Sequence, residues 1–103
     1  MLSFDERWLV FHHYVGAEDA VALGFSGPDA PGFAPYATQG SANLYLVDLH
    51  TGAVQRITQL GPGQYALFPH FRSDGWIYFV VRTLAGEEYF AASDAALVGE
   101  AVP

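Results

Sequence analysis

The stretch QYALFPHFRSDGWIYFVVR, from Gln64 to Arg82, indicates the fold class of this chain. Its Ser-Asp-Gly triplet is typical of a tight turn, because glycine readily adopts the positive φ that hairpin turns require. Before the turn, Pro69 predicts an irregular backbone position within a strand, since proline has no N–H to donate. After the turn, large apolar residues occupy both alternating sets of positions, so we expect a strand that is covered on both faces.

Similar short apolar runs, separated by turn residues, fill much of the remaining chain. They predict an all-β, antiparallel fold with strands at residues 8–15, 43–49, 53–60, 64–71, 76–82 and 87–93. Two of the turns between them are interpreted as structural, and they contain Thr51, Gly52, Asp74 and Gly75. The core is expected to hold large residues of these strands, namely Trp8, Phe11, Leu46, Phe68, Ile77 and Phe79.

Residues 16–42 interrupt the strand pattern. Their glycine, proline and alanine content predicts a long loop or insertion, with one helical turn near residues 18–23. Phe33 and Tyr36 lie inside it and are candidate ligand-binding residues, because aromatic rings at a rim suit contact with carbohydrate or peptide. A plain connecting loop is the favoured interpretation.

The apolar run after the Ser-Asp-Gly turn has a second copy earlier in the chain. In the first copy the turn SFDER, from Ser3, leads into WLVF. In the second copy the turn RSDG, from Arg72, leads into WIYFV. The two tryptophans, Trp8 and Trp76, are 76 − 8 = 68 positions apart. Without an insertion of about 25 residues, the period falls near the roughly 40 to 45 residues of a propeller blade. Radially packed blades would also cover both faces of an inner strand.

These motifs resemble the repeat of TolB-like β-propellers, in which a Pro-x-aromatic-Ser-x-Asp-Gly segment precedes an apolar strand, an IYxxD strand, a Thr-Gly turn and an RLT strand. The first part is matched by Pro69, Phe71, Ser73, Asp74 and Gly75, and the second part by Tyr45, Asp48, Thr51, Gly52, Arg56 and Thr58. The resemblance implies antiparallel propeller blades. The chain departs from the family pattern in two ways: its first copy lacks the innermost strand, and it carries the insertion.

The resemblance also implies an organisation. Residues 1–60 would form a first blade with the insertion at 16–42, and residues 61–103 a second, incomplete blade with a C-terminal tail. Two partial blades cannot close a ring, so the chain is expected to be a fragment, a terminal piece or one unit of an oligomer. Its expected partners are another protein, the remaining blades of a parent propeller, or further copies of itself. Members of this family are often periplasmic or exported, which implies a periplasmic or secreted location.

The charge balance excludes several classes of partner. Eleven acidic residues stand against four basic ones, and the net charge of −7 repels nucleic acid and anionic membrane surfaces. The absence of cysteine excludes disulfides and thiolate chemistry. No apolar stretch approaches the roughly 20 residues of a membrane span, and the N-terminus does not match a signal peptide.

No set of residues predicts catalysis, a cofactor or a metal site. His12 and His13 are neighbours on an expected strand and should point to opposite faces, which does not suit one shared metal. His70 is the better ligand-binding candidate, because the resemblance places its strand innermost, at the central channel. A hydrogen-bonded structural histidine is nevertheless favoured there. The segment GFSGP around Ser26 resembles a nucleophile elbow, but Pro28 stands where the elbow has its second glycine.

The functional hypothesis from the sequence is a non-catalytic binding or assembly module made of TolB-like propeller blades. The alternative is a propeller segment of a larger enzyme, such as a peptidase or a redox protein, that shapes access to a site elsewhere.

Overall fold

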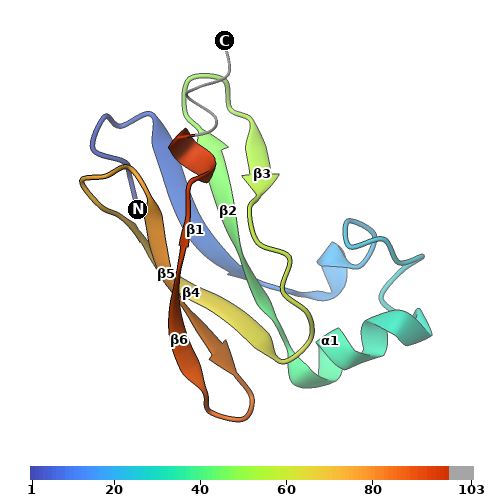
Figure 1. Cartoon of the computed structure of the whole chain (residues 1–103). Helices are drawn as coiled ribbons and strands as arrows, with labels where there is room; N and C mark the ends of the chain where they lie inside the picture. Colours follow the sequence, from blue (N-terminus) through green and yellow to red (C-terminus); the bar gives the residue numbers. More distant parts are fainter. Residues whose placement is uncertain (98–103) are drawn as a thin grey trace.

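The computed structural model describes residues 1–97, and these form a mostly β structure with one six-stranded sheet (Figure 1). The strands are β1 (Trp8–Tyr14), β2 (Ala42–Asp48), β3 (Val54–Arg56), β4 (Gln64–Phe71), β5 (Ile77–Thr83) and β6 (Glu88–Ser93). Between β1 and β2 lie two short 3₁₀ helices, η1 (Ala17–Asp19) and η2 (Pro31–Phe33), and one α-helix, α1 (Ala34–Gln39). The end of the expected C-terminal tail lies outside the described residues.

The sheet consists of two antiparallel halves. In the first half, β2 pairs with β1 and β3, and in the second half β5 pairs with β4 and β6. A single parallel pair, Ala42 with Tyr65, joins β2 to β4. The expectation of a purely antiparallel fold is therefore wrong at this junction. After β3 has returned the chain to the end where β2 begins, β4 has to run in the same direction as β2.

One hydrophobic cluster joins the two halves. Alternate residues of the strands from both halves contribute to it, as the period of two in a β-strand requires. Its buried members are Trp8, Val10, Leu44, Leu46, Ala66, Phe71, Ile77, Phe79, Val81 and Ala96. Four of the six predicted core residues, Trp8, Leu46, Ile77 and Phe79, are therefore confirmed.

The other two predicted core residues are wrong. Phe11 has the opposite parity to Trp8 and Val10 on β1, so its side chain lies on the outer face and is 38% exposed. Phe68 is 57% exposed and has a φ of 55° at a register shift between Leu67 and His70. Pro69 cannot donate to the sheet, and the resulting bulge turns Phe68 outward. The irregularity predicted from this proline is confirmed.

The structure covers the inner face of each half more fully than the outer face. In β5, Ile77, Phe79 and Val81 are buried, whereas Tyr78 and Val80 on the opposite face are half-buried. The sequence predicted coverage on both faces. Each half shields the inner face of the other. The outer faces are covered only in part: Leu67, which pairs with Val80, is 2% exposed, and Asn43 is 1% exposed, whereas Phe90 is 86% exposed.

β3 is shorter than the predicted strand at residues 53–60, because side chains replace its backbone pairing. The Thr58 hydroxyl accepts a hydrogen bond from the Leu44 N–H at 2.9 Å and donates one to Asn43 Oδ1 at 2.7 Å. Asn43 Oδ1 also accepts from the Leu60 N–H at 2.9 Å. Asn43 is 1% exposed, so these bonds satisfy polar groups away from water.

The insertion contains more regular structure than its composition predicted. The helical turn expected near residues 18–23 is limited to η1, and α1 was not predicted. Three aromatic rings, Phe25, Phe33 and Tyr36, contact one another with centroids 5.7 to 5.9 Å apart. The insertion that contains these rings lies to one side of the strands (Figure 1). Within residues 1–97, no helix has the length and apolar character needed to cross a membrane.

Candidate functional site

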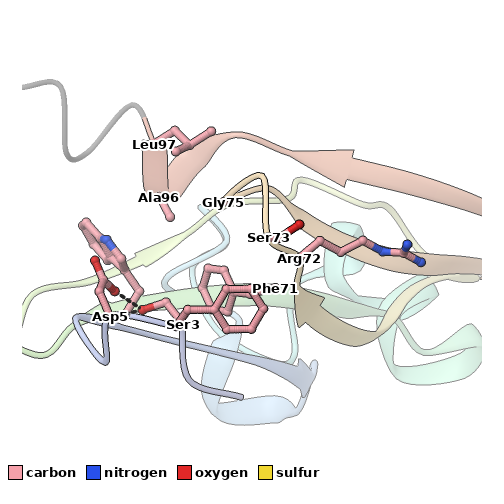
Figure 2. Close-up of a pocket in the computed structure, with 10 residues that line it drawn as sticks. Ser3, Asp5, Phe71, Arg72, Ser73, Gly75, Ala96 and Leu97 are labelled. Carbon is pink, nitrogen blue, oxygen red and sulfur yellow. Dashed lines mark hydrogen bonds between the residues drawn. The ribbon is translucent and has the colours of Figure 1, made fainter.

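A pocket of about 200 Å³ lies where three turns meet at one end of the strands (Figure 2). One turn precedes β1, a second joins β4 to β5, and the third is the short helical turn that follows β6. The sequence identified the first two as copies of one Ser-Asp motif but did not predict that they share a pocket. The lining residues are Ser3, Phe4, Asp5, Trp8, Phe71, Arg72, Ser73, Gly75, Ala96 and Leu97.

The polar groups of the first turn are engaged in holding that turn. The Ser3 hydroxyl donates to Asp5 Oδ1 at 2.6 Å and accepts from the Trp8 N–H at 2.9 Å. Asp5 Oδ1 also accepts from the Arg7 N–H at 3.1 Å. Ser3 and Asp5 therefore act as turn residues, and none of the described residues that line the pocket is a histidine that could activate the serine.

The second turn has an equivalent network around Asp74. Its Oδ1 accepts from the Trp76 N–H at 2.9 Å, and its Oδ2 accepts from the Tyr78 hydroxyl at 2.6 Å. The Tyr78 hydrogen bond is the largest cause of a lowered pKa at Asp74, and the same bond raises the pKa of Tyr78. Gly75, with a φ of 82°, completes this turn.

The turn between β2 and β3 also depends on a carboxylate. Burial raises the pKa of Asp48, but hydrogen bonds from the His50 N–H and Arg7 outweigh this effect, and the net pKa is lowered. The guanidinium of Arg7 lies 3.5 Å from Asp48 Oδ2. The Thr51 hydroxyl accepts from the Ala53 N–H at 3.2 Å, and Gly52 has a φ of 78°. These residues shape a turn.

His70, the ligand candidate on β4, lies on the outer face of the second half. Its ring stacks on Tyr78 with centroids 6.2 Å apart, and its Nδ1 is 3.4 Å from the carbonyl oxygen of Phe68. The side chain is half-buried. These contacts give the ring a structural role beside the bulge, and a role in binding stays a prediction.

Phe33 and Tyr36, the aromatic candidates in the insertion, lie together but apart from His70. Phe33 is 3% exposed and stacks on Tyr36, so its ring faces are occupied within the insertion. Tyr36 is half-buried and lines a small depression with Leu23, Arg56, Gln59 and Leu60. Of the two, only Tyr36 can offer a surface to a ligand without opening the insertion.

The arrangement at the three turns suits a small apolar group better than a reactive substrate. The apolar part of the lining comes from Phe4, Trp8, Phe71, Ala96 and Leu97. The carboxylates of Asp5 and Asp74 and the hydroxyl of Ser3 already serve the turns. Comparison of the chain with protein-family models, curated proteins and solved structures finds no match.

The Asp74 network predicts a dependence of stability on pH. Because the folded pKa of Asp74 lies below its ordinary value of 3.8, its stabilising contribution is present above that value and is lost as the pH falls through the folded pKa. We expect Asp74→Asn to reduce the fall in the free energy of unfolding between about pH 5 and pH 2.5. Urea unfolding of the unsubstituted chain and of Asp74→Asn at a series of pH values measures how the free energy of unfolding depends on pH.

The matched control for this pH prediction is Asp29→Asn, which removes one exposed carboxylate outside the network. The control is expected to keep the pH dependence of the parent chain. An unchanged pH dependence in Asp74→Asn would contradict a folded-state role for this carboxylate.

Proposed function

We propose that the chain is a non-catalytic binding and assembly module made of two TolB-like propeller blades. The observation that carries the proposal is that each half of the sheet has a second apolar face. The first outer face consists of Leu9, Phe11, Tyr45, Val47 and Val54, which the strand pairing places on one side. The second outer face consists of Tyr78, Val80 and Phe90.

These outer faces include strongly exposed residues. Val54 is 59% exposed and Phe90 is 86% exposed. Contiguous apolar surface of this kind usually marks an interaction site in soluble proteins. In a propeller, neighbouring sheets would pack on both faces, so the remaining blades of a parent chain or further copies would bury these residues.

The internal repeat also supports the proposal. The Ser3 N–H donates to the Trp8 carbonyl at 2.8 Å, and the Arg72 N–H donates to the Trp76 carbonyl at 3.1 Å. Each turn is followed by a strand of equal length and its antiparallel partner. Leu2 forms an isolated bridge with Leu9, which would be the end of the innermost strand of the first blade. By the same resemblance, we propose a periplasmic or secreted location.

The proposal predicts that the isolated chain associates with itself through unlike faces. The first outer face of one copy would pack on the second outer face of the next copy, which is a heterologous contact. We expect concentration-dependent sedimentation for the unsubstituted chain of 103 residues. Val54→Asp and Phe90→Asp should each reduce association, because each buries an unpaired charge in the contact.

A mixture of these two variants provides a sharper measurement. Each variant keeps one intact face, and those faces are complementary, so the mixture should form a one-to-one complex that cannot grow further. Val21→Asp, at a 69% exposed site in the insertion, is the matched control and should associate like the parent chain. A compact, concentration-independent parent monomer that binds no apolar dye would overturn the proposal and indicate a self-sufficient β domain.

A further inference from the structure

Three potential metal ligands meet where β1 passes into the insertion. They are His13 near the end of β1 and Glu18 and Asp19 in η1. Their ligand atoms all lie within 4.8 Å of one another. The sequence did not predict this group, because strand periodicity relates His13 only to its neighbour His12 and not to the residues of η1.

Two of the three ligands are already held in place by the fold. Asp19 Oδ2 accepts a hydrogen bond from the Gly16 N–H at 2.7 Å, which fixes the carboxylate. The ring of His13 lies edge-on to Tyr45, with centroids 5.7 Å apart. Such outer contacts orient ligands before a metal arrives.

The spacing between these two ligands fits a shared cation. His13 Nε2 lies 3.0 Å from Asp19 Oδ2. Ligands about 2.0 to 2.2 Å from one ion, at octahedral or tetrahedral angles, are separated by roughly 3.0 to 3.5 Å. A cation can therefore bridge the two atoms at their observed separation.

Gly16 leaves room for the third ligand. Its φ of −118° suits any residue, so backbone conformation does not require glycine there. A Cβ at this position would lie 2.5 Å from both carboxylate oxygens of Glu18. The missing side chain thus keeps open the space occupied by the Glu18 carboxylate, for which the described residues provide no ion pair.

We propose that His13, Glu18 and Asp19 bind a first-row divalent cation such as Zn²⁺. One imidazole nitrogen and two carboxylate oxygens are ligands that this class of ion accepts, and the two negative charges attract it. Glu18 is exposed, and in its observed position its carboxylate oxygen lies within 4.8 Å of the other two ligand atoms. The three ligands leave a coordination position open beside a shallow depression of about 250 Å³, lined also by Phe11, Tyr45 and Val54.

The experiment is calorimetric titration of Zn²⁺ into the full chain carrying Phe90→Asp. This background limits self-association and leaves the metal ligands intact, so the result does not depend on the proposed assembly. We expect one Zn²⁺ per chain. His13→Ala and the double variant Glu18→Gln/Asp19→Asn should each weaken binding by about tenfold or more. Circular dichroism of each variant checks that it is folded.

Gly16→Ala tests the geometry while keeping all three ligands. The added Cβ should displace the Glu18 carboxylate and weaken Zn²⁺ binding, with the circular dichroism spectrum unchanged. His50→Ala removes an exposed histidine from the turn before β3 and should bind like the parent. The proposal is overturned by no saturable binding in the folded parent, by equal weakening in His50→Ala, or by tighter binding of Ca²⁺ than of Zn²⁺.

Discussion

Replacing Phe79 with alanine is expected to lower the free energy of unfolding by about 3 to 5 kcal/mol, the usual range for a buried phenylalanine. Phe79 is 6% exposed and lies in β5, within the cluster shared by both halves of the sheet. Removing its ring takes apolar contacts from this cluster and leaves a cavity. Urea unfolding at one low protein concentration measures the change.

Phe4→Ala is the matched control for Phe79→Ala. Phe4 is 69% exposed in the turn before β1, so the same truncation should change the free energy of unfolding by no more than about 0.5 kcal/mol. A loss below about 1 kcal/mol in Phe79→Ala would mean that the shared cluster does not hold the two halves together.

The second large effect is expected for Asn43→Ala, which should cost about 2 to 4 kcal/mol. The substitution removes the acceptor for both the Thr58 hydroxyl and the Leu60 N–H. Each buried donor that loses its partner costs roughly 1 to 3 kcal/mol. The loss should also free the segment after β3, because Asn43 replaces the backbone partners that a longer strand would have had.

A double-mutant cycle with Thr58→Val isolates this effect. Thr58→Val keeps the shape of the side chain but removes its hydroxyl, so the cost of Asn43→Ala should be smaller in that background than in the parent. Gln55→Ala, at an exposed position of β3, serves as the control and should be close to neutral. Additive costs for Asn43→Ala and Thr58→Val would contradict the proposed network.

Local patterns in the sequence were sufficient for most strands and turns. Apolar runs of suitable length predicted β4 at its observed bounds and the other long strands within one residue at each end. The Ser-Asp-Gly and Thr-Gly triplets predicted turns, because glycine is the residue that adopts positive φ at little cost. Pro69 predicted the bulge in β4 from a missing donor.

The candidate sites depended on contacts between distant segments. His70 was selected from its place in a resembled repeat, and the structure surrounds it with Tyr78 and the Phe68 carbonyl. Phe33 was selected as an exposed aromatic, but Phe25 and Tyr36 bury its ring. The group around His13 was missed because strand parity alone does not show that η1 folds back against the end of β1.

The sequence by itself thus determined the β-rich class, the main strands and the turns, since these follow from the period of two and from the special backbones of glycine and proline. Only the tertiary structure decided which parity faces the core, and hence that Phe11 and Phe68 lie outside. It also decided that β2 and β4 meet in parallel, and that the outer face of each half is covered only in part. These features depend on where each half of the sheet meets the other. A strand with apolar residues on both faces contains no local signal that shows which face will pack against the other half.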